Sequence, residues 1–161
     1  MATLPAASAT GAIPPHILIM DACAPVRDLL LDALAPAGYR LTAWHALLDI
    51  ADVAALQPDL IIMERVFAGS MAASRQFLRQ ASQDPTLTRV PVVLSTTQSP
   101  RGCGRPATEA LQDEAVHLLI KPYAIDDLLA LVQTCVDSGP PPASRVAGPG
   151  SMSRKRIDAI T

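Results

Sequence analysis

Residues 58–65 read PDLIIMER. Its apolar run at 60–63 is continuous rather than alternating, which is typical of a short strand buried on both faces. The run stops at Glu64 and Arg65, so a carboxylate stands where the strand ends. The role of that carboxylate depends on which other strands end beside it.

Similar apolar runs recur along the chain, and each is followed by a segment with helical spacing. Strands are predicted at 16–20, 39–43, 60–63, 90–96 and 115–120, and helices from residue 24 to the break at Pro36 and at 45–56, 72–82, 108–114 and 124–136. Right-handed crossovers between parallel strands place helices on both faces of a sheet. The alternation therefore predicts an α/β fold with a five-stranded parallel sheet and helices on both faces.

The two ends of the chain differ from its middle in composition. Prolines are frequent before His16, and SGPPPASRVAGPGS at 138–151 is rich in Pro, Gly, Ser and Ala. Such segments bury too little apolar surface to offset the entropy lost on ordering. We therefore expect disordered tails at 1–15 and 138–161, the second with a short basic end, and one folded domain at 16–137.

The composition argues against several classes of protein. Lys and Arg number 13 against 15 Asp and Glu, the net charge is -2, and aromatic residues make up 3%, which disfavours nucleic-acid binding. No run approaches the roughly 18 apolar residues of a membrane span, and the N-terminus lacks the pattern of a secretion signal. The scattered cysteines Cys23, Cys103 and Cys135 have no metal-ligand spacing. They favour reduced thiols and a cytoplasmic protein.

Polar residues stand where the predicted strands end. Because the carboxyl ends of parallel strands meet at one edge of a sheet, these side chains are expected to converge there. They are Asp21, Glu64, Ser95 with Thr96, and Lys121 with Pro122.

The segments ILIMD, PDLIIME, VPVVLST and LIKPY, in this order, resemble the receiver domain of bacterial response regulators. The resemblance covers almost the whole of 16–137 and implies a flavodoxin-like (CheY-like) fold and two-component phosphorelay signalling. In that family an Asp ending the third strand takes a phosphoryl group from a histidine kinase. An acidic pair after the first strand holds Mg²⁺, while a Ser or Thr and a Lys contact the phosphoryl oxygens. The Lys-Pro bond is typically cis.

The resemblance places Glu64, not an Asp, at the phosphoacceptor position. Thr96 and Lys121 match the phosphoryl-contact positions, and Pro122 follows the lysine. The acidic pair is half present, because Ala22 follows Asp21. Asp21 is thus a candidate metal ligand, or simply a carboxylate that the adjacent helix dipole favours.

These departures bear on the chemistry. Mg²⁺ takes near-octahedral oxygen ligands, so the loss of one carboxylate at Ala22 predicts weak binding. Glu is longer than Asp by about 1.5 Å, one carbon-carbon bond. A misplacement near 1 Å costs roughly a hundredfold in rate. Phosphotransfer to Glu64 is therefore disfavoured.

Two hypotheses remain for Glu64. It forms an ordinary ion pair with Lys121 at the rim of a degenerate pocket, or it imitates a phosphorylated Asp by pairing with Lys121 and accepting a hydrogen bond from Thr96. The first is favoured, and residual phosphorylation is a third alternative.

The favoured function is an atypical, stand-alone receiver protein that is not an enzyme. It would act by binding a signalling partner, a histidine kinase or a downstream effector, through the helix, strand and helix expected at 108–136. One alternative is a conventional phosphorylated single-domain regulator. Another is a small α/β enzyme such as a flavin-binding protein or a phosphatase, which the absence of a Gly-rich phosphate loop after Asp21 disfavours. The oligomeric state is not predicted.

Overall fold

A computed structural model of the chain describes residues 13–97 and 116–138. Five parallel strands form one sheet in the order β2-β1-β3-β4-β5. The strands are β1 (His16–Met20), β2 (Arg40–Trp44), β3 (Leu60–Glu64), β4 (Val92–Thr96) and β5 (Val116–Ile120). The helices are α1 (Ala24–Leu34), the short 3-10 helix η1 (Ala35–Ala37), α2 (Ile50–Leu56), α3 (Ala72–Gln83) and α5 (Ile125–Ser138).

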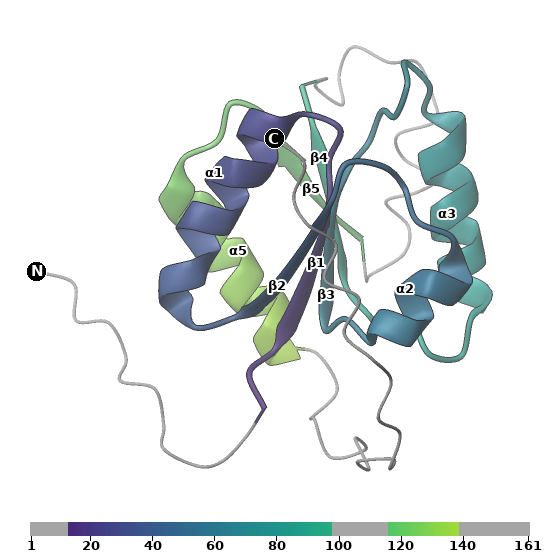
Figure 1. The fold of residues 1–161 in the computed structure, drawn as a ribbon, viewed down its shortest axis with the longest axis horizontal. Coiled ribbons are helices and arrows are strands. Elements are labelled where there is room, and N and C mark those ends of the chain that lie inside the picture. The colour runs from purple at the N-terminus through teal and green to yellow at the C-terminus, as the bar shows by residue number, and fades with distance from the viewer. Residues whose placement is uncertain (1–12, 98–115, 139–161) are drawn as a thin grey trace, which may run out of the picture.

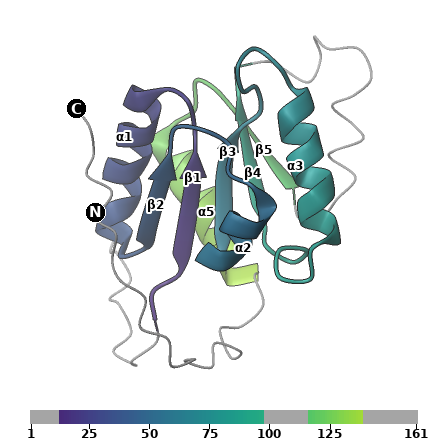
Figure 2. The ribbon, with the colours of Figure 1, turned by 45° about the vertical axis from the view of Figure 1, so that its right-hand side comes forward.

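Helices cover both faces of the sheet, as Figures 1 and 2 show from two directions. Helices α1 and α5 lie together on one face, and α2 and α3 lie on the other. The predicted α/β fold with a parallel sheet is confirmed. The helix expected at 108–114 and nearly all of the two expected tails lie outside the described residues, and α5 continues to Ser138.

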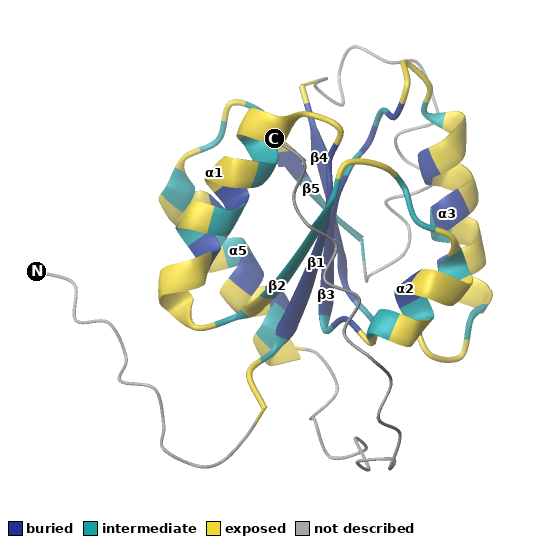
Figure 3. Ribbon diagram, in the orientation of Figure 1, coloured by how far each residue is buried: buried dark blue, intermediate teal, exposed yellow. Residues whose placement is uncertain are grey.

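The alternation of side chains along each strand produces two cores. In β1, Ile17 and Ile19 pack against α1 and α5, whereas Leu18 and Met20 pack against α2 and α3. All five residues of β1 are buried (Figure 3), and in β3 only the last residue, Glu64, is not. The continuous apolar run at 60–63 therefore predicted the burial of this central strand correctly.

The helix predicted at 45–56 begins later than expected, at Ile50. Residues 45–49 are not helical, although Leu47 and Leu48 still pack against the α2/α3 core. Asp49 is extended (φ -67°, ψ 150°), and its carbonyl accepts the Val53 N–H at 3.0 Å, which opens the helix. Apolar spacing alone predicted the longer helix because it does not distinguish a helical turn from a packed loop.

Two backbone turns shape the ends of elements near the sheet. Gly38 has φ 82° and ends η1, in the left-handed region that glycine enters without a steric penalty. After β3, Phe67 and Ser70 exchange backbone hydrogen bonds of 3.1 and 2.9 Å around a tight turn through Ala68 and Gly69. This turn, with the buried Phe67, sets the path of the chain from β3 to α3.

None of the helices in the described part of the chain has the length and apolarity that crossing a membrane would require. Of the three cysteines, Cys23 is exposed and Cys135 is buried, and both are free thiols. Cys103 lies outside the described residues.

Candidate functional site

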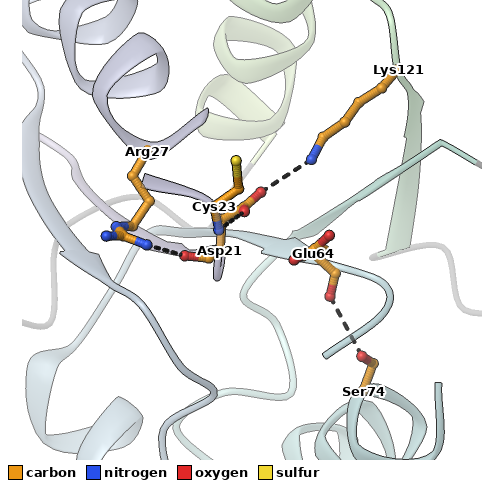
Figure 4. A network of polar contacts seen from close by, with 6 residues as sticks. All are labelled: Asp21, Cys23, Arg27, Glu64, Ser74 and Lys121. Carbon is orange, nitrogen blue, oxygen red and sulfur yellow. Dashed lines mark hydrogen bonds and ion pairs between the residues drawn. The ribbon is translucent and has the colours of Figure 1, made fainter. Parts of the chain in front are cut away.

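The carboxyl ends of β1, β3 and β5 bring three charged side chains together. Asp21 directly follows β1, Glu64 ends β3 and Lys121 directly follows β5. All three follow core residues of the α1/α5 face at a spacing of two, so they point to that side of the sheet. Figure 4 shows the Lys121 side chain extending toward the Asp21 carboxylate, with Glu64 beside it.

Asp21 forms contacts through both its side chain and its main chain. Its side chain is 2% exposed, Oδ1 accepts the Cys23 N–H at 2.8 Å, and Oδ2 lies 3.2 Å from Lys121 Nζ. Its backbone carbonyl accepts a hydrogen bond of 2.7 Å from Nη1 of Arg27, and its N–H donates to the Trp44 carbonyl at 3.1 Å. Arg27 lies in the first turns of α1, so this contact ties the helix back to the end of β1.

Lys121 is fixed through both its side chain and its main chain. Its side chain is 17% exposed and forms an ion pair with Asp21, while its N–H donates to the Thr96 carbonyl at 2.7 Å. The Lys121-Pro122 peptide bond is cis, as the resemblance implies. Lys121 and Thr96 are thus neighbours across β4 and β5.

Glu64 is half-buried and lies beside the Asp21–Lys121 pair (Figure 4). Burial raises the pKa of its carboxyl, and the charge of Asp21 raises it further, while Lys121 and the backbone N–H of Ala22 lower it. Desolvation and a like charge together outweigh the opposing contacts, so the Glu64 carboxylate is incompletely compensated.

The prediction of an ion pair between Glu64 and Lys121 is wrong, because the Lys121 ammonium pairs with Asp21 instead. Asp21 is more deeply buried than Glu64, so leaving its charge without a counter-ion would cost more free energy. Glu64 is more exposed and keeps partial hydration. The sequence predicts that all three residues lie at one edge of the sheet, but it does not determine which carboxylate forms the ion pair with Lys121.

The end of β4 lies beside this cluster. Ser95 is opposite Glu64 in the register of β3 and β4, and Thr96 is opposite Ile120 in β5. Both side chains are buried, at 1% and 3% exposure. Alternation along β4 places the Ser95 side chain on the same face of the sheet as Glu64, and the predicted Thr96 is the next residue at the end of this strand.

Two contacts near Glu64 escaped the sequence-based prediction. The Ser74 hydroxyl, in the first turn of α3, donates to the Arg65 carbonyl at 2.6 Å and lies 3.4 Å from the Glu64 carbonyl (Figure 4). Arg65 is itself 7% exposed, and its Nη1 has no hydrogen-bond partner among the residues that the structure describes. The signal for Ser74 would have been a hydroxyl in an otherwise apolar inner face of the helix, with Phe77 and Ala81.

No protein-family model matches the chain, and the comparison with curated proteins found no match. Solved structures do match. The chemotaxis protein CheY4 of Vibrio cholerae superposes with a TM-score of 0.60 at 20% identity, over 76% of this chain and 99% of that one.

Two further matches are receiver domains by name. That of the sensor histidine kinase PA1611 from Pseudomonas aeruginosa gives a TM-score of 0.60 at 21% identity, over 78% of this chain and 100% of that one. That of Nitrogen Regulatory Protein C gives 0.59 at 26% identity, over 76% and 94%. The chain has the fold of a response-regulator receiver domain. The Pseudomonas domain holds a magnesium ion in its active-site cleft.

Within the receiver fold, the three charged side chains stand at the edge where the resemblance locates the phosphorylation site. The part of the chain that the structure describes contains no group of three or more His, Cys, Asp or Glu side chains able to hold a metal. Ala22, where the family has a second acidic residue, is exposed and supplies no side-chain oxygen.

The raised pKa of Glu64 predicts a pH-dependent stability difference. A carboxyl whose folded pKa lies above its ordinary 4.5 stabilises the fold most below that pH and loses this contribution as the pH rises through the folded pKa. The free energy of unfolding of Glu64→Gln should therefore equal that of the wild type below pH 4.5 and exceed it at neutral pH. The difference should stay below about 1 kcal/mol, because the Glu64 carboxyl is partly hydrated. Urea unfolding across this range measures the difference. A variant less stable than the wild type at neutral pH would contradict the expectation.

Proposed function

We propose that the protein is an atypical receiver module of two-component signalling, which acts by binding a partner protein and not by accepting a phosphoryl group. The receiver fold supports the signalling role, since receiver domains are signalling domains rather than enzymes. The partner is a histidine kinase or a downstream effector. Glu64 fills the phosphoacceptor position.

The observation that carries the proposal is the ion pair of Lys121 with Asp21. In the family, the equivalent lysine contacts the phosphoryl group on the third strand. Here its ammonium lies 3.2 Å from Asp21 Oδ2, and the Glu64 carboxylate faces the Ala22 N–H. A phosphoryl group at Glu64 would have to draw the lysine away from a carboxylate that is 2% exposed. Leaving that charge unpaired is costly.

The same pairing bears on the hypothesis of a constitutive phosphate mimic. A mimic requires the charge at residue 64 to hold Lys121, whereas the lysine is held at Asp21. Glu64 then occupies the acceptor position without reproducing the phosphorylated arrangement. The mimic remains distinguishable, because only a mimic would lose partner binding on Glu64→Gln.

The proposal predicts that acetyl phosphate does not phosphorylate the protein. Intact-mass spectrometry after incubation with acetyl phosphate should show no added phosphate, with or without millimolar Mg²⁺. One physical reason is the longer glutamate side chain, whose misplacement alone would slow phosphotransfer roughly a hundredfold. The other is that Lys121 is paired with Asp21.

The matched control is the double variant Ala22→Asp, Glu64→Asp, which restores the acidic pair and the shorter acceptor in the same fold. Labelling of this variant and not of the wild type supports the proposal. Phosphate on Glu64 of the wild type would instead favour a conventional phosphorylated regulator. Recovery of no signalling protein in a pull-down from the source cells would count against the partner-binding role.

A further inference from the structure

Both oxygens of the Asp21 carboxylate are already engaged within the chain. Asp21 Oδ1 accepts the Cys23 N–H at 2.8 Å, and Oδ2 pairs with Lys121 at 3.2 Å. The Glu64 carboxylate faces the backbone N–H of Ala22. These contacts come from the β1–α1 connection and from the end of β5, two segments that the sheet holds in place.

This donor set does not fit the magnesium ion that the receiver fold implies. Mg²⁺ requires near-octahedral oxygen ligands at about 2.0–2.1 Å and keeps several of its waters. Asp21 is 2% exposed and directs one oxygen to a backbone N–H and the other to an ammonium. Ala22 contributes no carboxylate. A hydrated divalent ion would have to displace the lysine to reach the one buried carboxylate.

The charges lead to the same result. Asp21 and Glu64 carry two negative charges and Lys121 carries one positive charge. Because the ammonium already lies against the more buried carboxylate, a divalent cation at Asp21 would bring two positive centres to one site. The metal and the lysine therefore compete for the same carboxylate oxygen.

We infer that Lys121 is the permanent cation of this site, in place of a divalent metal, and that it excludes Mg²⁺ from Asp21. This inference rests on the proposed function, since it concerns the same site and explains why that site requires no metal. The Asp21–Lys121 bridge then joins the ends of β1 and β5 whether or not Mg²⁺ is present.

The test is a titration of the full chain with Mg²⁺, and with Mn²⁺ as a paramagnetic probe, followed by nuclear magnetic resonance. In the wild type, the amides of residues 21–23 and 64 and the Lys121 ammonium should not shift at millimolar Mg²⁺ or broaden selectively with Mn²⁺. Lys121→Met should bind Mg²⁺ at least about tenfold more tightly, because the substitution removes the positive charge that competes with the metal for the Asp21 carboxylate. Lys121→Arg keeps the charge and should behave as the wild type.

A saturable Mg²⁺ shift centred on Asp21 in the wild type, with movement of the Lys121 ammonium signal, would overturn the inference. So would a Lys121→Met variant that folds and binds Mg²⁺ no more tightly than the wild type. The wild-type titration needs no variant and decides the question if Lys121→Met is unfolded.

The two proposals fail separately. Mg²⁺ binding without phosphate labelling refutes the lysine as the permanent cation and leaves the atypical receiver intact. Phosphate labelling without Mg²⁺ binding refutes the atypical receiver and leaves the lysine in place.

Discussion

Leu30→Ala should lower the free energy of unfolding by about 3 kcal/mol. Leu30 is fully buried in α1 and belongs to the core that α1 and α5 form with the sheet. Removing its side chain loses the transfer free energy of the deleted carbons and leaves a cavity, because the close-packed strands of β1 and β3 cannot collapse into it. Urea unfolding monitored by circular dichroism measures the change.

The neighbouring residue provides the matched control. Leu29 is in the same helix and is 47% exposed. Its replacement by alanine deletes the same atoms but no core contact, so the cost should stay within about 0.5 kcal/mol. Similar effects at the two positions would mean that α1 does not pack on the sheet through the Leu30 face.

Asp21→Asn should destabilise the protein by about 2 kcal/mol at neutral pH. Asparagine keeps the volume and an oxygen for the Cys23 N–H, but it removes the counter-ion of Lys121. The cost falls below that of a fully buried pair because the Lys121 side chain is 17% exposed and regains some hydration. The same unfolding experiment measures it.

The substitution should also change Glu64. The charge of Asp21 is one of the two causes that raise the pKa of the Glu64 carboxyl, so this pKa should fall in the variant, as Lys121 becomes available to Glu64. Carboxyl-carbon resonance titration detects the shift. An Asp21→Asn protein that is as stable as the wild type, with an unchanged Glu64 titration, would show that the bridge contributes nothing.

The positions of the strands followed from the sequence because buried parallel strands leave continuous apolar runs. The run at 60–63 corresponds to β3 (Leu60–Glu64), and the run at 16–20 corresponds to β1. The start of α2 did not follow, since Leu47 and Leu48 pack as apolar residues in a loop just as they would in a helix. Periodicity reports burial and not backbone conformation.

The candidate site was likewise predicted only in part. Topology predicted that Asp21, Glu64 and Lys121 meet, because parallel strands end at one edge. The choice of Asp21 as the partner of Lys121 depends on burial and on distances of a few ångströms, which no pattern of residue types encodes. The Arg27 contact was missed for a similar reason, because it reaches a backbone carbonyl and not a side chain.

Lys121 pairs with Asp21 and not with Glu64, and two double-mutant cycles can measure this preference. One combines Asp21→Asn with Lys121→Met, and the other combines Glu64→Gln with Lys121→Met, each followed by urea unfolding at neutral pH. We predict that the Asp21–Lys121 coupling free energy exceeds the Glu64–Lys121 coupling by about 1 kcal/mol or more. A Glu64–Lys121 coupling free energy that equals or exceeds the Asp21–Lys121 value would show that Glu64, and not Asp21, is the charge that holds the lysine.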